Sequence, residues 1–172
     1  MTNSSIRQYV TITKDYPLAA AKAFSKISSP DKPFRFIYVS GGGATTRPSS
    51  FTSLQGRIKG ETETALSELC TPSFHVESVR PVGIDAANHT AIKPFIPDPG
   101  LAYHMMAFAA LPLIRTAFRS IHSPTEHLGP FLVGLAMGQY DNQLDAGGKG
   151  ITKVNGLRIL DNSAFRRLYG LT

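Results

Sequence analysis

The residues best suited to chemistry are a serine at the end of an apolar run and a lysine on the next predicted helix. Ser40 directly follows the apolar run 34–39 and leads into three glycines. Its hydroxyl can hydrogen-bond a substrate carbonyl or alcohol, and glycines let the backbone approach a ligand closely. Lys59 lies four residues after Gln55, so both share one helix face. The Lys59 ammonium can hold a ribose hydroxyl and lower the pKa of a neighbouring acid. The Gln55 amide does not titrate and cannot pass a proton.

Strands and helices are predicted to alternate around these residues. Strands are indicated by β-branched or continuous apolar runs, and helices by apolar residues three and four apart. In chain order we expect a strand at 9–13, a helix at 18–26, a strand at 34–39, a helix at 54–69 and a strand at 75–79. This alternation produces parallel βαβ units, which bind ligands at the carboxyl ends of their strands. One edge of such a half-sheet stays unpaired unless another strand joins it.

The second half of the chain is expected to be mostly helical. Residues 85–100 are rich in proline and are predicted to form a loop. Strand-like alternation at 151–160 surrounds a possible Asn155-Gly156 hairpin turn. Helices are expected at 103–110, 114–120, 128–139 and 162–168.

The composition is that of a single globular domain. Of the 172 residues, 42% are hydrophobic and 17% are charged, and the one cysteine cannot form an internal disulfide. The net charge of +6 favours anionic partners, but the basic residues are dispersed, so we expect no nucleic-acid partner. The apolar window 101–114 is shorter than the roughly 20 residues that span a bilayer. With no signal peptide recognisable at the N-terminus, we expect no membrane span and a cytoplasmic location.

Three segments together resemble the atypical short-chain dehydrogenase/reductases. They are Phe-Ile-Tyr-Val-Ser-Gly at 36–41, Gly-Arg-Ile-Lys-Gly-Glu-Thr-Glu at 56–63 and Val-Arg-Pro-Val-Gly at 79–83. More narrowly, the chain from about Tyr9 onward is similar to the second half of fungal nucleoside-diphosphate-sugar epimerase-like, NAD(P)-binding Rossmann proteins. The resemblance implies an α/β fold with an incomplete Rossmann-like parallel sheet, flanking helices and a helical C-terminal half.

The resemblance also implies roles for individual residues. Ser40, Gln55 and Lys59 would stand at the catalytic positions, with Ser40 polarising the substrate oxygen and Lys59 binding the nicotinamide ribose. The segment 80–83 would lie near the nicotinamide. The residues expected to bind NAD(P) are therefore Thr13, Ser40, Lys59, Pro81, Val82 and Gly83.

Two departures limit what the resemblance implies. Position 55 holds glutamine in place of the tyrosine of the family's proton relay, and the sequence has no Gly-x-x-Gly-x-x-Gly turn for the cofactor's diphosphate. Because that turn supplies most of the phosphate binding, we expect weak binding of NAD(P). We expect one partial NAD(P)-binding Rossmann-like domain over 1–172, with a βαβαβ core at 1–84 and a loop and mostly helical substrate-side region at 85–172.

Two functions remain open from the sequence. The first is a truncated relative of epimerases and reductases, oxidoreductase-like if active, that acts on a small-molecule substrate. The second is a non-catalytic scaffold or interaction module derived from that fold, which could form a homo-oligomer through its sheet edge.

Other patterns in the sequence are weaker. Ser40, His75 and Asp85 could form a hydrolase triad, although no Gly-x-Ser-x-Gly turn surrounds the serine. His104, His122 and His127 lack the spacing of metal ligands, so no metal site is expected.

Overall fold

The centre of the molecule is a four-stranded sheet in the order β1-β2-β6-β5. The computed structural model describes residues 3–98 and 100–171, apart from the side chains of 102–104, 106 and 107. β1, β2 and β6 are parallel, and β5 is antiparallel to β6. The strand bounds are β1 Phe34–Val39, β2 Phe74–Arg80, β5 Ile151–Val154 and β6 Leu157–Asp161.

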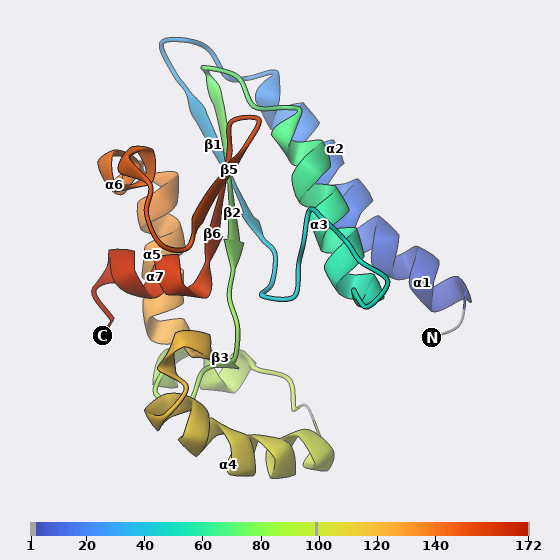
Figure 1. Cartoon of the computed structure of the whole chain (residues 1–172), viewed down its shortest axis with the longest axis vertical. Coiled ribbons are helices and arrows are strands. Elements are labelled where there is room, and N and C mark those ends of the chain that lie inside the picture. Colours follow the sequence, from blue (N-terminus) through green and yellow to red (C-terminus); the bar gives the residue numbers. More distant parts are fainter. Residues whose placement is uncertain (1–2, 99, 172) are drawn as a thin grey trace.

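Helices cover both faces of this sheet (Figure 1). One face carries α2 and α3, and the other carries α5, α6 and α7; α1 precedes α2 and has no buried residue. The predicted α/β fold, with a mostly parallel sheet and flanking helices, is confirmed. The helix bounds are α1 Asn3–Val10, α2 Tyr16–Ser25, α3 Leu54–Ser67, α5 Thr125–Ala136, α6 Asp141–Ala146 and α7 Asn162–Tyr169.

The segment 9–13, predicted to be a strand, is helical instead. It spans the end of α1 and the start of η1 (Thr11–Asp15), a π-helical turn that continues into α2. β-branched residues favour strands on their own, but tertiary packing overrides such preferences. Here the Thr13 carbonyl accepts hydrogen bonds from the Tyr38 hydroxyl at 3.1 Å and the Thr62 hydroxyl at 3.4 Å. The segment therefore packs against β1 and α3 as a helix and adds no strand to the sheet.

Two apolar cores form because side chains alternate between the faces of a strand. Val76 of β2 and Ile159 of β6 face α2 and α3, in a core that includes Leu66. Val79 and Leu160, on the same strands, face α5 and α7. The second core is centred on three aromatic rings, those of Phe131, Phe165 and Tyr140.

The second half of the chain supplies two of the four strands. The predicted hairpin is confirmed, and Asn155 and Gly156 both take positive φ values in its turn, 46° and 89°. The helix predicted at 103–110 and the start of the one predicted at 114–120 form a single helix, α4 (Leu101–Thr116), which continues past Pro112. The end of the second prediction lies beyond α4, where the short 3₁₀ turn η3 (Arg119–Ile121) begins. The short helical turn η2 (Thr90–Phe95) interrupts the predicted loop.

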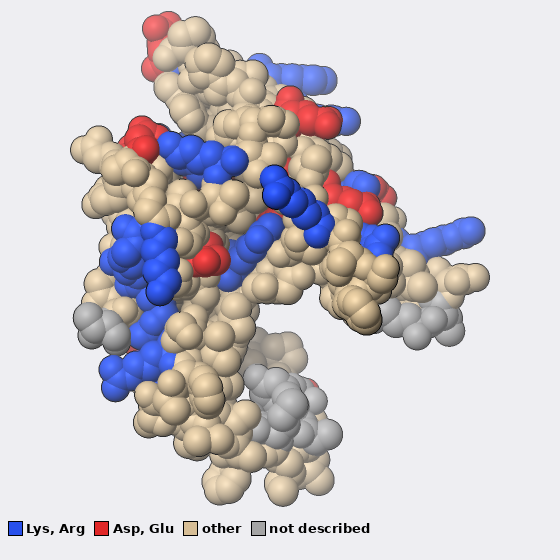
Figure 2. All heavy atoms as spheres, in the orientation of Figure 1, with Lys and Arg blue, Asp and Glu red and all other residues tan. Residues whose placement is uncertain are grey.

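The α4 region extends beyond the carboxyl end of the sheet (Figure 1). A small parallel ladder joins it to the body, formed by β3 (Ile84–Asp85) and β4 (Ser123–Pro124). Within the part of the chain that the structure describes, no helix is long and apolar enough to cross a bilayer. On the face shown in Figure 2, Lys and Arg gather at the left, over the α7 region, and elsewhere lie among Asp and Glu.

The loop after β1 packs closely on α3 because α3 carries glycine at the contact. The side chain of Ser53 caps the helix by accepting a hydrogen bond from the Gly56 amide at 3.1 Å. A Cβ atom placed on Gly60 would lie 1.8 Å from the Thr45 carbonyl oxygen. The loop can therefore reach the helix only while position 60 has no side chain.

We expect Gly60→Ala to lower the free energy of unfolding by about 1–3 kcal/mol, as overpacking does elsewhere. A matched control is Gly129→Ala in α5, where an added Cβ would meet no atom within 4 Å. The control should be neutral or stabilising by up to about 1 kcal/mol, because alanine favours helix over glycine. Urea denaturation followed by circular dichroism checks both. A Gly60→Ala protein as stable as the parent would contradict this packing.

Candidate functional site

Ser40 is held at the carboxyl end of β1 with its hydroxyl buried. Its amide donates to the Val79 carbonyl at 2.8 Å, which extends the pairing of β1 with β2 by one residue. The residue is only 5% exposed, and its Oγ has no hydrogen-bond partner within the described residues. Since nearly all buried polar groups in folded proteins are hydrogen-bonded, this unpaired hydroxyl is exceptional and marks the strand end as a candidate site.

Lys59 of α3 meets the same strand end. Its Nζ donates to the Ser40 carbonyl oxygen at 2.9 Å. Burial lowers the pKa of Lys59, and the nearby Glu63 carboxylate opposes that change. The structure thus brings together the serine and lysine that the sequence singles out; their catalytic roles stay a prediction.

The acids near Lys59 are engaged with other cations. Glu63 is fully buried and accepts from the Ser78 hydroxyl at 2.8 Å and from Arg80 Nε at 2.9 Å. Glu61 pairs with Lys14 at 3.0 Å. Within the described residues, no carboxylate lies within ion-pair distance of Lys59. One feature of the sequence indicates that Glu63 lies near this site, namely its position one helical turn after Lys59.

The turn after Ser40 lies against the end of β2. The Gly42 amide donates to the Pro81 carbonyl at 3.1 Å, and a Cβ on Gly42 would lie 2.1 Å from Val82 Cγ2. Gly42 and Val82 line a pocket of about 320 Å³ that also reaches the end of β6. Gly83, with φ of +52°, packs instead against the Ile121 carbonyl. Of the predicted segment 81–83, Val82 is thus the residue that faces this pocket.

Thr13 and Lys59 line a different pocket, of about 390 Å³, on the outer side of β1. Burial raises the pKa of Tyr38, which also lines it, to about 12. The rest of this lining was not predicted from the sequence, because the pattern at 9–13 favoured a strand. The missed lining residues are Tyr9, Ile12, Pro17, Tyr38 and Val39. The helical spacing of Tyr9, Thr13 and Pro17, four residues apart, was the available signal.

Gln55 lies in the first turn of α3, one turn before Lys59, as expected. It is partly exposed and is not among the residues that line these two pockets. Its amide lies on the face that carries Lys59 but offers no titratable group there.

The hydrolase triad is wrong. His75 lies opposite Arg35 near the start of β2, whereas Ser40 follows the end of β1, so about five residues, or about 16 Å, separate them along the strands. The Asp85 carboxylate is engaged elsewhere. It accepts hydrogen bonds from Arg115 Nε at 2.7 Å and from Arg115 Nη2 at 2.9 Å, and His122 Nε2 lies 2.9 Å from its Oδ2.

No group of three or more potential metal ligands occurs among the described residues. His122 is engaged with Asp85, and His127 lies 3.6 Å from Glu126. The side chain of His104 lies outside the described residues.

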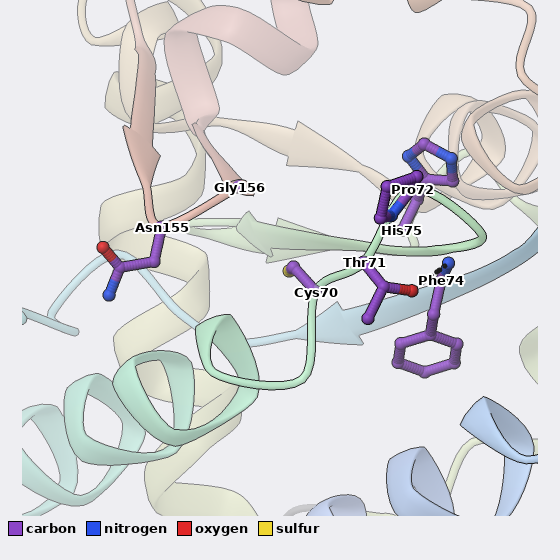
Figure 3. A pocket seen from close by; sticks show the side chains of 7 residues that line it. All are labelled: Cys70, Thr71, Pro72, Phe74, His75, Asn155 and Gly156. Carbon is purple, nitrogen blue, oxygen red and sulfur yellow. Dashed lines mark hydrogen bonds between the residues drawn. The ribbon is translucent and has the colours of Figure 1, made fainter.

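A further hollow, of about 250 Å³, lies at the opposite end of the sheet (Figure 3). There Cys70 lies beside the hairpin turn, with its Cβ 3.1 Å from where a Cβ on Gly156 would be. Burial raises the pKa of the Cys70 thiol, which disfavours the reactive thiolate. Because ligands of parallel sheets bind at the carboxyl ends of strands, we place the site at Ser40 and Lys59.

Comparison with known proteins gives one informative relative. The chain is 40% identical over 158 residues, 90% of this chain and 99% of the relative, to botcinic acid biosynthesis cluster B protein 16 of Botryotinia fuckeliana (strain B05.10). The chain belongs to the family of this protein. No family model matches the chain, and no solved structure matches it. The name of this relative assigns that protein, from Botryotinia fuckeliana, to a biosynthesis cluster.

The contact of Asp85 with Arg115 and His122 gives a pH-dependent prediction. The Arg115 guanidinium holds the pKa of Asp85 well below its usual range. Because this pKa is lower in the folded state, ionised Asp85 stabilises the fold fully above the unfolded-state pKa of about 3.9. That stabilisation is lost as the pH falls below this value towards the pKa of the folded state. We expect Asp85→Asn to lower the free energy of unfolding by about 1–3 kcal/mol at pH 7. The difference from the parent should shrink between about pH 5 and pH 2.

Urea denaturation at a series of pH values measures this difference. A deficit that stays constant down to the lowest pH would show that the Asp85 charge is not responsible.

Proposed function

We propose that this protein is an NAD(P)-binding, reductase- or epimerase-like α/β protein that acts in the biosynthesis of a small organic acid. The observation that carries the proposal is the buried, unpartnered hydroxyl of Ser40, next to a carbonyl that holds the Lys59 ammonium at 2.9 Å. The relative's place in a botcinic acid biosynthesis cluster supports a biosynthetic role. The resemblance of 36–41, 56–63 and 79–83 to short-chain dehydrogenases supports the cofactor.

The described residues fit one end of NAD(P) only. The buried Ser40 hydroxyl has an unused hydrogen bond, and Lys59 has two N–H bonds beyond the one given to the Ser40 carbonyl. The close contact of Gly42 with Val82 leaves backbone, not side chain, at the base of the site. These features suit a nicotinamide riboside. The sequence has no glycine-rich turn for the diphosphate.

The chemistry that the cofactor would supply is hydride transfer. Ser40 would donate a hydrogen bond to the substrate oxygen and stabilise developing negative charge there. Lys59 would orient the ribose and favour the anionic form of a nearby acid by its charge. Gln55 cannot deliver a proton, so turnover by this chain depends on another acid or on solvent.

The proposal predicts a specific order of affinities. Reduced nicotinamide mononucleotide and NADH should bind with similar, weak affinity, because the protein offers no diphosphate site to hold the adenosine half of NADH. ADP-ribose, which lacks the nicotinamide, should not bind. Lys59→Met should lower the affinity for nicotinamide mononucleotide about tenfold or more, and Ser40→Ala should lower the affinity for a substrate carbonyl compound. Lys153→Met is the matched control, because Lys153 bonds the Asp145 carbonyl at the far end of the sheet.

Isothermal titration calorimetry measures these affinities on variants whose folding is verified by circular dichroism. Failure of a folded protein to bind either nicotinamide compound would overturn the proposal. NADH binding far tighter than that of the mononucleotide would overturn the one-ended fit.

A second function is favoured by the edge of the sheet. β1 is an edge strand, and its residues 34 and 40 direct their amides toward β2, so those of 35, 37 and 39 face outward. Val39 is 46% exposed at the end of this edge. An exposed apolar edge strand is a template for pairing with another chain.

If the protein is an interaction module, it should form a concentration-dependent dimer in light-scattering measurements. Val39→Pro, which removes an outward amide, should then weaken the dimer without loss of helix content. A strictly monomeric protein that binds the nicotinamide compounds would exclude this second function.

A further inference from the structure

The pocket on the outer side of β1 has the size and walls of a small-molecule site. Its volume of about 390 Å³ lies within the range of about 300–1,000 Å³ typical of ligand pockets. Ile12, Pro17 and Val39 supply apolar wall, and Tyr9 and Lys59 supply polar groups. The wall that faces the solvent is not sealed by a neighbouring strand, because β1 ends the sheet.

Within the described residues, no carboxylate forms an ion pair with the Lys59 ammonium of this pocket. Lys59 gives one N–H to the Ser40 carbonyl, which leaves two for a ligand. Glu63 is held by Arg80 and Ser78 on β2, so that pair contributes no net charge. No carboxylate is among the residues that line the pocket. The site is therefore suited to an anion.

The main chain beside the pocket has an unusual conformation. Ile12 and Thr13 belong to η1, a π-helical turn in which the Tyr16 amide bonds the Thr11 carbonyl. Such turns are rare and are frequently found at functional sites. The Tyr9 hydroxyl, one turn earlier, has no hydrogen bond with any described residue. An unusual turn, a free phenol and a half-buried ammonium thus converge on one hollow.

We propose that this pocket binds a small carboxylic acid with an apolar body. The carboxylate lies on Lys59 Nζ, the Tyr9 hydroxyl is the second donor, and the apolar body contacts Ile12, Pro17 and Val39. Charge-assisted hydrogen bonds of this kind are about twice as strong as neutral ones, and partial burial of Lys59 limits competition from water. The inference goes beyond the proposed function, because it requires no dinucleotide.

Octanoate is the probe, with octanol as its uncharged counterpart, and calorimetry measures binding to the whole chain. We expect octanoate to bind and octanol to bind much more weakly. Lys59→Met should lower the affinity for octanoate about tenfold or more, and the isosteric Tyr9→Phe should lower it about threefold or more. The matched control is Lys22→Met, which removes the same charge from the exposed face of α2 and should change octanoate binding less than about twofold.

Each outcome decides the inference. Octanoate binding that is lost in Lys59→Met and kept in Lys22→Met supports it, and Tyr9→Phe supplies the same test should Lys59→Met fail to fold. Absence of octanoate binding, or equal binding of octanol, overturns it. The nicotinamide titrations test the proposed function separately. If the protein binds octanoate but no nicotinamide compound, only the proposed function is overturned. If it binds a nicotinamide compound but not octanoate, only this inference is overturned.

Discussion

The hydrogen bond from Lys59 to the Ser40 carbonyl organises the whole candidate site. The carbonyl is rigid because the amide of Ser40 is itself bonded to Val79 of the neighbouring strand. Burial disfavours the charged form of Lys59, as its lowered pKa shows, so the carbonyl and the Glu63 carboxylate must offset part of that desolvation. The desolvation cost that remains can be offset by a ligand, because an anion beside the ammonium would stabilise its charged form.

The buried acid Glu63 completes this arrangement by joining α3 to β2. It takes hydrogen bonds from Ser78 and Arg80, and so fixes the helix against the second strand while Lys59 fixes it against the first. A buried carboxylate without such partners would be strongly destabilising. Because Glu63 is committed to Arg80, the charges are separated, with a neutral pair inside the fold and a net positive charge at the pocket.

The sequence predicted the central elements and the meeting of Ser40 with Lys59, because both follow from local pattern and from the geometry of parallel strands. It failed at 9–13, where β-branched residues suit a strand but the Thr13 carbonyl bonds to Tyr38 and Thr62. That contact joins residues far apart in the chain and leaves no mark in local propensity. The same error hid the pocket, whose wall is made by that segment. The division of the predicted nicotinamide segment, with Val82 facing a pocket and Gly83 facing Ile121, likewise depends on the distant β4 region.

Two hollows lie near the carboxyl end of the sheet, and Gly42 and Val82, which approach each other closely, line one of them. One, beside Lys59, is positively charged and partly apolar; the other, beside Val82, is lined by polar groups that include Arg80 and Asn162. Glycine at position 42 permits the contact with Val82, because a Cβ there would lie 2.1 Å from Val82 Cγ2. A larger residue would displace Val82, which lines the second hollow, so this turn is the point at which fold and binding constrain the same atoms.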